Sequence, residues 1–192
     1  MTVLVCLDGS DGTGKSTVAA MLPAMLSPLT SRVFAHEHPG VCDAWASALW
    51  YAARRAEVAS RMALGLEPDL VIADRWWPTA AVFAEVRGDD AALTLARMES
   101  RQLPQPALVV VLDASDATLA ARRPDASPDE VRARALSRDP ERLARWGASV
   151  VNVEGRGAVE IAREVAGMVA HALRIARWHA DNERVLRERE GR

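Results

Sequence analysis

A glycine-rich stretch near the N-terminus constrains this chain more than any other feature of its sequence. The stretch reads Gly9-Ser10-Asp11-Gly12-Thr13-Gly14-Lys15-Ser16-Thr17 and matches the pattern G-x-x-x-x-G-K-[ST] of a phosphate-binding loop. An apolar run at 3–7 precedes it and a helical pattern at 18–26 follows it, which is the strand-loop-helix context that the pattern requires. The alternative, a glycine-rich turn without function, needs a chance match, which arises in roughly 1% of chains this long.

The chemistry of this loop predicts a polyphosphate ligand. Glycines let successive backbone N–H groups point into one concavity, and the positive end of the following helix adds to their field. We therefore expect residues 9–17 to bind ATP, with Lys15 reaching the β- and γ-phosphates and Ser16 offering its hydroxyl to Mg²⁺. Lys15 is the only lysine of the chain. All the other Lys/Arg positions hold arginine. This preference for arginine elsewhere suggests that a compact ammonium, rather than a planar guanidinium, is needed at position 15.

Composition describes an ordinary globular protein. The 192 residues are enough for a full core, so we expect a single domain over 1–192. The formal net charge of −2 gives no basic excess and argues against a nucleic-acid polymer as partner. The apolar run at 3–7 is too short for a signal peptide or a membrane span, so we expect no membrane partner. Cys6 and Cys42 fit reduced residues, and the sequence favours a cytoplasmic protein.

Strand-like and helix-like segments alternate along the chain. We expect strands at 3–7, 32–36, 69–73, 108–112 and 149–153. Helical patterns cover 18–26, 43–64, 78–86, 90–101, a stretch from 116, and 158–189, with a C-terminal helical extension at about 176–192. This alternation predicts an α/β fold with a five-stranded parallel sheet and helices on both of its faces.

Charged residues follow the third and fourth predicted strands. Asp74 can hold Mg²⁺ through water, while Arg75 can clamp a phosphate with two hydrogen bonds. Asp113, at the end of the strand at 108–112, competes for the metal role. We favour Asp74 with Ser16 as the metal site, because an adjacent phosphate clamp explains both Asp74 and Arg75. A surface ion pair between these two residues is the alternative.

Several short motifs occur in order over residues 1–123. Asp11 stands two residues after the first glycine of the loop, and His38-Pro39-Gly40 follows the second predicted strand. Later come Tyr51-Ala52-Ala53-Arg54-Arg55-Ala56, Asp74-Arg75-Trp76-Trp77-Pro78-Thr79-Ala80-Ala81-Val82-Phe83, and Asp113 with Arg122 nine residues on. The set resembles the thymidylate kinases, whose motifs include Glu-Pro-Gly, Phe-Ala-x-Asp-Arg-Ala and Asp-Arg-Tyr-x-x-Ser-x-x-Ala-Tyr. The resemblance implies a P-loop kinase fold, ATP and Mg²⁺ as cofactors, nucleotide substrates, and transfer of the γ-phosphate to dTMP.

The resemblance also implies roles for side chains around the acceptor nucleotide. Asp11 accepts a hydrogen bond from the 3′-hydroxyl of the sugar. Tyr51 stacks on the base, Arg55 donates to a base carbonyl, and Thr79 and Phe83 line the base and sugar. The residues alone leave other readings open, since helical spacing also fits Tyr51 and Phe83 as core aromatics and Arg55 as a solvated arginine. The helix at 43–64 is implied to form a homodimer interface.

An arginine-rich segment at about 122–146 is expected to form a lid over ATP. Its arginines, interleaved with acids, are Arg122, Arg123, Arg132, Arg134, Arg138, Arg142 and Arg145. Some thymidylate kinases carry an arginine inside the phosphate loop, whereas positions 10–13 hold none here, so another cation must serve the γ-phosphate. The resemblance implies that Arg122 stacks on the adenine, and most of the other arginines fit a salt-bridged surface helix. The predicted catalytic residues are Lys15, Asp74, Arg75, Arg123 and Arg138.

The acceptor is the least constrained part of this prediction. Glu37 stands where many thymidylate kinases have arginine, and we expect it to contact the substrate. A deoxynucleoside kinase is one alternative, because such enzymes need a general base for a neutral 5′-hydroxyl and Glu37 can supply it. A P-loop regulator that only binds or slowly hydrolyses ATP is another. A modified pyrimidine monophosphate in place of dTMP is a third.

Overall fold

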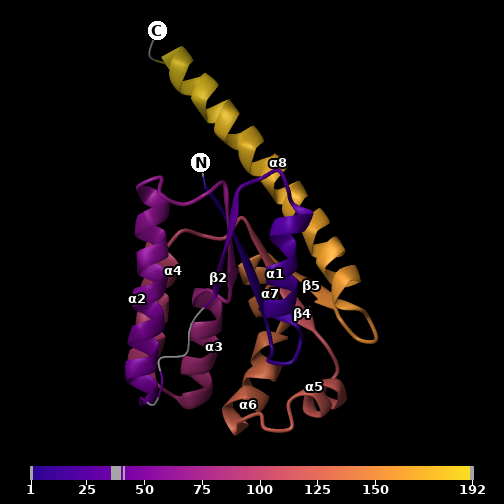
Figure 1. Cartoon of the computed structure of the whole chain (residues 1–192). Helices are drawn as coiled ribbons and strands as arrows, with labels where there is room; N and C mark the ends of the chain where they lie inside the picture. Colours follow the sequence, from indigo (N-terminus) through magenta and orange to yellow (C-terminus); the bar gives the residue numbers. More distant parts are fainter. Residues whose placement is uncertain (1, 36–39, 41, 191–192) are drawn as a thin grey trace.

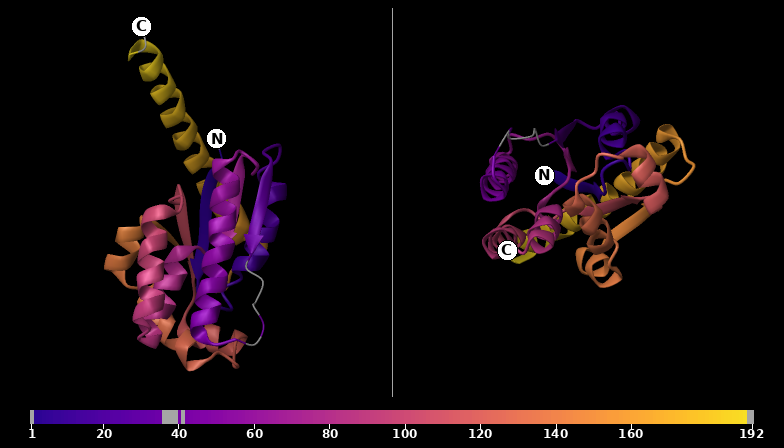
Figure 2. Two further views of the ribbon diagram at one scale, coloured as in Figure 1. Left: turned by 90° about the vertical axis from the view of Figure 1, so that its left-hand side faces the viewer. Right: turned by 90° about the horizontal axis from the view of Figure 1, so that it is seen from below.

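The core of the molecule is a parallel sheet with the strand order β2-β3-β1-β4-β5. The computed structural model describes residues 2–35, 40 and 42–190, with residues 183–190 as backbone. Within them the strands are β1 (Val3–Gly9), β2 (Ser31–Ala35), β3 (Leu70–Asp74), β4 (Leu108–Asp113) and β5 (Ala148–Asn152). Helices cover both faces of this sheet (Figures 1 and 2). The α/β fold class predicted from the sequence is therefore confirmed.

The helices divide between the two faces. They are α1 (Lys15–Met25), α2 (Ala44–Ala63), α3 (Trp77–Arg87), α4 (Asp90–Gln102), α5 (Asp116–Arg122), α6 (Pro128–Ser137), α7 (Pro140–Trp146) and α8 (Ala158–Glu190). Helices α1 and α8 pack on one face, while α2, α3 and α4 lie over the other (Figure 1). The segment predicted as a lid comprises the end of α5 together with α6 and α7.

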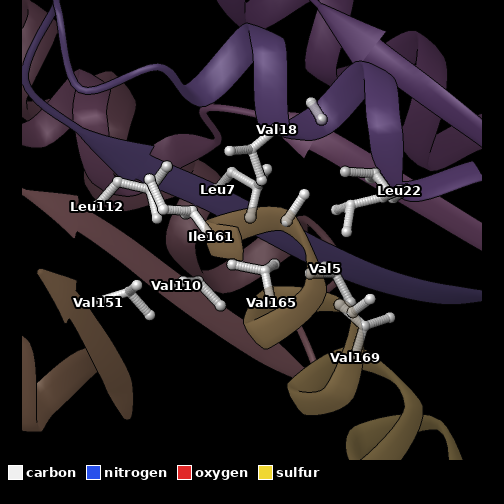
Figure 3. Close-up of a cluster of buried hydrophobic side chains, with 14 of the residues drawn as sticks. Val5, Leu7, Val18, Leu22, Val110, Leu112, Val151, Ile161, Val165 and Val169 are labelled. Carbon is white, nitrogen blue, oxygen red and sulfur yellow. The ribbon is translucent and has the colours of Figure 1, made fainter. Parts of the chain in front are cut away.

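The alternating side chains of β1 show why both faces carry a core. Every residue of β1 is buried, which is the pattern of a parallel strand covered on both sides. Val5 and Leu7 pack with Val18 of α1 in the cluster that α8 completes (Figure 3). Leu4 and Cys6, which alternate with them along the strand, pack on the other face with Val58 of α2. The central strand is thus held from both sides.

The carboxyl ends of the central strands meet at one edge of the sheet. Leu7 pairs with Asp74 of β3, and Gly9 pairs with Leu112 of β4. The loop that follows β1 therefore begins beside Asp74 and beside Asp113, which comes directly after Leu112. This edge is where open α/β sheets bind their ligands.

The first helix begins earlier than the sequence predicted. Helix α1 starts at Lys15 rather than Val18, because Gly14 adopts left-handed backbone angles and ends the loop. Residues 15–17 consequently form the first turn of the helix. The other predicted elements agree with the structure to within two residues at each described boundary.

Helix α8 extends well beyond the sheet. Its first half buries Ile161, Val165 and Val169 in the core. Its second half, which includes the predicted C-terminal extension, projects away from the other elements (Figures 1 and 2). None of the helices in the described part of the chain is both long enough and apolar enough to cross a membrane.

Candidate active site

The phosphate loop depends on a glycine at its first position. Gly9 has a φ of +125°, and a Cβ built there would lie 2.2 Å from the carbonyl oxygen of Leu112. Any side chain at this position would push β1 and β4 apart, so only glycine fits. Gly12 and Gly14 each have a φ of +89°, which other residues rarely adopt. The loop therefore has the backbone that the sequence pattern predicts.

Lys15 lies in the concavity of this loop. Its Nζ donates to the carbonyl oxygen of Ser10 at 2.8 Å and lies 3.4 Å from Oδ1 of Asp11. Burial, followed by repulsion from the guanidinium of Arg75, lowers the pKa of Lys15 from 10.5 to about 8. The only lysine of the chain is thus a buried amine whose charge depends strongly on its neighbours.

Two oxygen ligands suitable for Mg²⁺ meet beside the loop. The hydroxyl of Ser16 donates to Oδ2 of Asp74 at 2.6 Å. The hydroxyl at the start of α1 and the carboxylate at the end of β3 are hard oxygen ligands of the kind that Mg²⁺ prefers, with phosphates and water completing its shell. Among the residues that the structure describes, no three His, Cys, Asp or Glu side chains gather to bind a metal by themselves. The residues present fit a magnesium ion held jointly with a nucleotide.

Asp113, the competing candidate, is held by an arginine of the lid segment. Nε of Arg138 donates to Oδ1 of Asp113 at 2.8 Å, and Nη1 donates to Asp116 at 2.7 Å. Nη2 of Arg138 donates to the carbonyl oxygen of Ala114 at 2.5 Å. All three nitrogens of Arg138 therefore bind the end of β4 and the start of α5.

Arg75 has an unusual backbone conformation for a residue with a side chain. Its φ is +72°, and it is the one described residue other than glycine with a positive φ. Its backbone N–H donates to the carbonyl oxygen of Leu7 at 2.8 Å, which fixes this turn against β1. The turn directs the guanidinium toward the loop, where Nη2 contacts Oδ1 of Asp11. Left-handed angles at such a residue cost about 1–3 kcal/mol and are typical of functional sites.

Asp11 is an ionised carboxylate among cations. Burial alone would raise its pKa, but the charge of Arg75, a hydrogen bond with the side chain of Glu130 and the charge of Lys15 outweigh this and lower it from 3.8 to about 2. The structure thus brings three of the predicted site residues, Asp11, Lys15 and Arg75, together at the mouth of a cavity.

This cavity has a volume of about 510 Å³ and runs from the phosphate loop between α2, α3 and α4. Its polar end contains Lys15, Ser16, Asp74 and Arg75, and further along the wall come Tyr51, Arg55, Thr79 and Phe83. The hydroxyl of Thr79 donates to Oδ2 of the buried Asp8 at 2.7 Å. The guanidinium groups of Arg75 and Arg87 lie 5.8 and 5.4 Å from the ring centre of Phe83. All the acceptor residues named from the sequence, apart from Glu37, therefore line one cavity or its mouth.

Glu99 of α4 is a cavity residue that the sequence did not single out. Its carboxylate accepts from Nε of Arg55 at 2.7 Å and from Nη2 of Arg55 at 2.8 Å. Arg55 is therefore neither solvated nor isolated. Arg55 and Glu99 are 44 positions apart and lie on different helices, so their pairing leaves no local sequence signal. The one hint is that Glu99 falls one turn after Ala96 on the buried face of α4.

The lid arginines differ in their surroundings. Nη1 of Arg122 donates to the carbonyl oxygen of Gly12 at 3.1 Å, while Arg123 binds Asp125 and lies 3.9 Å from Asp11. Arg134 of α6 is only 6% exposed, and no described residue forms a hydrogen bond or ion pair with it. Arg134 is one of the arginines of the predicted lid, but it is not among the catalytic residues predicted from the sequence. Its burial is a property that only the packed structure reveals.

The predicted contact of Glu37 falls outside the described residues. The same holds for residues 38 and 39 of the loop that resembles Glu-Pro-Gly. The predicted role of Glu37 in binding the acceptor or as a general base therefore stays a prediction.

Two solved structures that share this fold are thymidylate kinases. Thymidylate kinase from Candida albicans aligns with a TM-score of 0.69 and 16% identity over 88% of this chain and 92% of that chain. The enzyme from Ehrlichia chaffeensis aligns with a TM-score of 0.65 and 17% identity over 88% of this chain and 98% of that chain. No protein-family model matches the chain, and no curated protein matches it. At this level of identity the likeness shows a shared fold.

The buried setting of Lys15 predicts an unusual titration. Protein labelled with ¹³Cε-lysine gives a single side-chain NMR signal from the chain's only lysine. We expect its midpoint near pH 8 in the folded protein, and a higher midpoint in Arg75→Ala, because that substitution removes a repelling charge. Urea-unfolded protein serves as the control, with a midpoint near 10.5. A folded-state midpoint equal to the unfolded one would contradict this description of the loop.

Proposed function

We propose that the protein is a nucleoside monophosphate kinase that transfers the γ-phosphate of Mg·ATP to a pyrimidine deoxynucleoside monophosphate, dTMP before others. The observation that carries the proposal is the continuity of one cavity. A phosphate loop with Lys15 and a second phosphate ligand, Arg75, lie at its mouth, and aromatic and polar side chains line the rest. A protein that only bound or hydrolysed ATP would need the first half alone, so the regulator is the weaker alternative.

We assign the binding of ATP, the phosphate donor, to the loop at 9–17. Its backbone N–H groups and the start of α1 would hold the phosphates of ATP. Ser16 and Asp74 would hold Mg²⁺, which supplies positive charge to the β- and γ-phosphates. Arg122, whose Nη1 donates to the carbonyl oxygen of Gly12, would cover the adenine.

We assign the binding of the acceptor nucleotide, the monophosphate that receives the phosphoryl group, mainly to α2 and α3. Arg75 would bind the acceptor phosphate, and Asp11 beside it would accept from the sugar hydroxyl. Tyr51 and Phe83 would pack on the base and sugar. The hydroxyl of Thr79 donates to Asp8, which leaves its oxygen free to accept from the nucleotide.

The reaction asks the protein for alignment and charge rather than for a strong base. An acceptor phosphate oxygen is already anionic, so attack on the γ-phosphate needs the two nucleotides in line and their charges neutralised. Lys15 and Arg75 provide two of the cations. Closure of α6 over the cavity, where Ser127 and Glu130 already line the wall, would exclude water and limit ATP hydrolysis.

Arg134 is the best candidate for the remaining cation. It lies one helical turn beyond Glu130, which lines the cavity, so the two residues are neighbours on one face of α6. Arg138, one further turn along, is fully engaged with Asp113, Asp116 and the carbonyl oxygen of Ala114. We therefore assign Arg138 to anchoring the lid and Arg134 to the transferred phosphoryl group, with Arg123 near Asp11 as an auxiliary cation.

The test of the proposed function is an ADP-release assay with Mg·ATP and a panel of acceptors: dTMP, dUMP, dCMP, dGMP, dAMP and thymidine. We expect the highest kcat/KM with dTMP, and we expect Arg75→Ala to lower it by about 100-fold or more because it removes a charged phosphate contact. Arg101→Ala, an exposed arginine at the end of α4, is the matched control and should keep the activity. Turnover of thymidine without any monophosphate would contradict the proposal and make Glu37 the residue to change.

The assignment of Arg134 makes a separate prediction. Arg134→Met should lower kcat by about 100-fold with little change in KM for ATP, because the interaction forms mainly in the transition state. It should not lower the melting temperature, since it removes a buried charge that has no described partner. Arg132→Ala, on the exposed side of the same helix, should leave both quantities unchanged. A fall in stability with unchanged kcat would show a structural role instead.

A further inference from the structure

The inner wall of the acceptor cavity contains a buried ion pair in which Glu99, the partner of Arg55, has no role so far. Arg55 comes from α2 and Glu99 from α4, and their side chains are only 4% and 7% exposed. Removing two charges from water is costly, and a buried pair is often no more stabilising than apolar residues of similar size. Because the pair lies in the wall of the cavity, we look for its role in the recognition of the bound nucleotide. This inference rests on the function proposed above.

The hydrogen bonds of this pair leave a defined set of free groups. The carboxylate of Glu99 accepts hydrogen bonds from Nε and Nη2 of Arg55, one on each of its oxygens. Nη2 of Arg55 keeps its second N–H, Nη1 has no partner among the described residues, and each oxygen of Glu99 keeps a second lone pair. Since a bidentate arginine-carboxylate pair is close to planar, the wall offers a donor directly beside an anionic acceptor.

This pattern matches one kind of base edge. Thymine, uracil and guanine present a carbonyl oxygen next to a ring N–H, so they can accept from Arg55 and donate to Glu99. Cytosine and adenine present an amino group next to an unprotonated ring nitrogen. In the same position their amino group would face the guanidinium and their lone pair would face the carboxylate, so both contacts would be unfavourable.

We propose that Glu99 is the residue that selects keto bases over amino bases, by accepting a hydrogen bond from the ring N–H while it holds Arg55 against the adjacent carbonyl. A carboxylate cannot donate, so it has no means of pairing with the bare ring nitrogen of cytosine. This assigns to Glu99 a contact with the nucleotide as well as the positioning of Arg55.

The substitution Glu99→Gln tests this assignment. The side chains have the same shape, but the amide can turn its NH₂ toward a ring nitrogen. We expect the ratio of kcat/KM for dTMP to that for dCMP to fall by about tenfold or more, chiefly through KM. Glu67→Gln is the matched control, because Glu67 is also buried and paired with arginines, Arg32 and Arg61, but lies outside the cavity. It should leave the ratio unchanged.

A second measurement uses the wild-type protein and so does not depend on how the variant folds. N3-methyl-dTMP lacks the ring N–H, and we expect it to bind at least about tenfold more weakly than dTMP in calorimetry. An unchanged dTMP:dCMP ratio in folded Glu99→Gln, or equal affinity for dTMP and its methylated form, overturns the inference.

Failure of the proposed function has a different signature. If the wild-type protein phosphorylates none of the monophosphates, the kinase assignment fails by itself. The inference about Glu99 is then decided by equilibrium binding: dTMP bound more tightly than dCMP by the wild type, with the preference lost in Glu99→Gln, supports it. Equal binding of the two nucleotides, or binding of neither, overturns it.

Discussion

The close approach of β1 and β4 at Gly9 is the constraint on which the site depends. A Cβ at Gly9 would meet the carbonyl oxygen of Leu112 at 2.2 Å, so the strand can turn into the phosphate loop only with glycine there. That turn places Lys15 at the start of α1 and the loop beside Asp74, which ends the neighbouring strand, and Arg75, which follows it. The remainder of the sheet serves to hold these strand ends in register.

Electrostatics gives this edge its chemical character. Lys15 is buried with a lowered pKa, Asp11 has a lowered pKa between two cations, and Arg75 occupies a strained backbone conformation that directs it to Asp11. Charges held in fixed positions by buried structure need little rearrangement when a phosphate binds, which is the property expected of a site for phosphoryl transfer. The lid arginines differ in how much unpaired positive charge they can add to this edge. Most of them are already paired with carboxylates, whereas Arg134 is buried without a described partner.

The sequence predicted what local patterns can encode. The phosphate loop, the alternation of strands and helices and the pair Asp74-Arg75 each occupy a short stretch, and the structure brings them together where the strand ends meet. The pairing of Arg55 with Glu99 and the burial of Arg134 were not predictable, because they depend on how distant helices pack. The choice of Arg138 came from charge alone, without knowledge that Asp113 would bind it. The homodimer, the cytoplasmic location and the role of Glu37 stay predictions; Trp45 and Leu49, exposed on α2, fit the predicted interface.

The central claim is that one cavity takes both nucleotides, with their phosphates meeting between Lys15 and Arg75. It is tested most directly by calorimetry with a single molecule that joins adenosine to thymidine through a chain of phosphates. Because such a ligand occupies both halves at once, it should bind about 100-fold more tightly than ATP, and the gain should disappear in Arg75→Ala. An affinity no greater than that of ATP, or dTMP that displaces ATP from the same half of the cavity, would contradict the account.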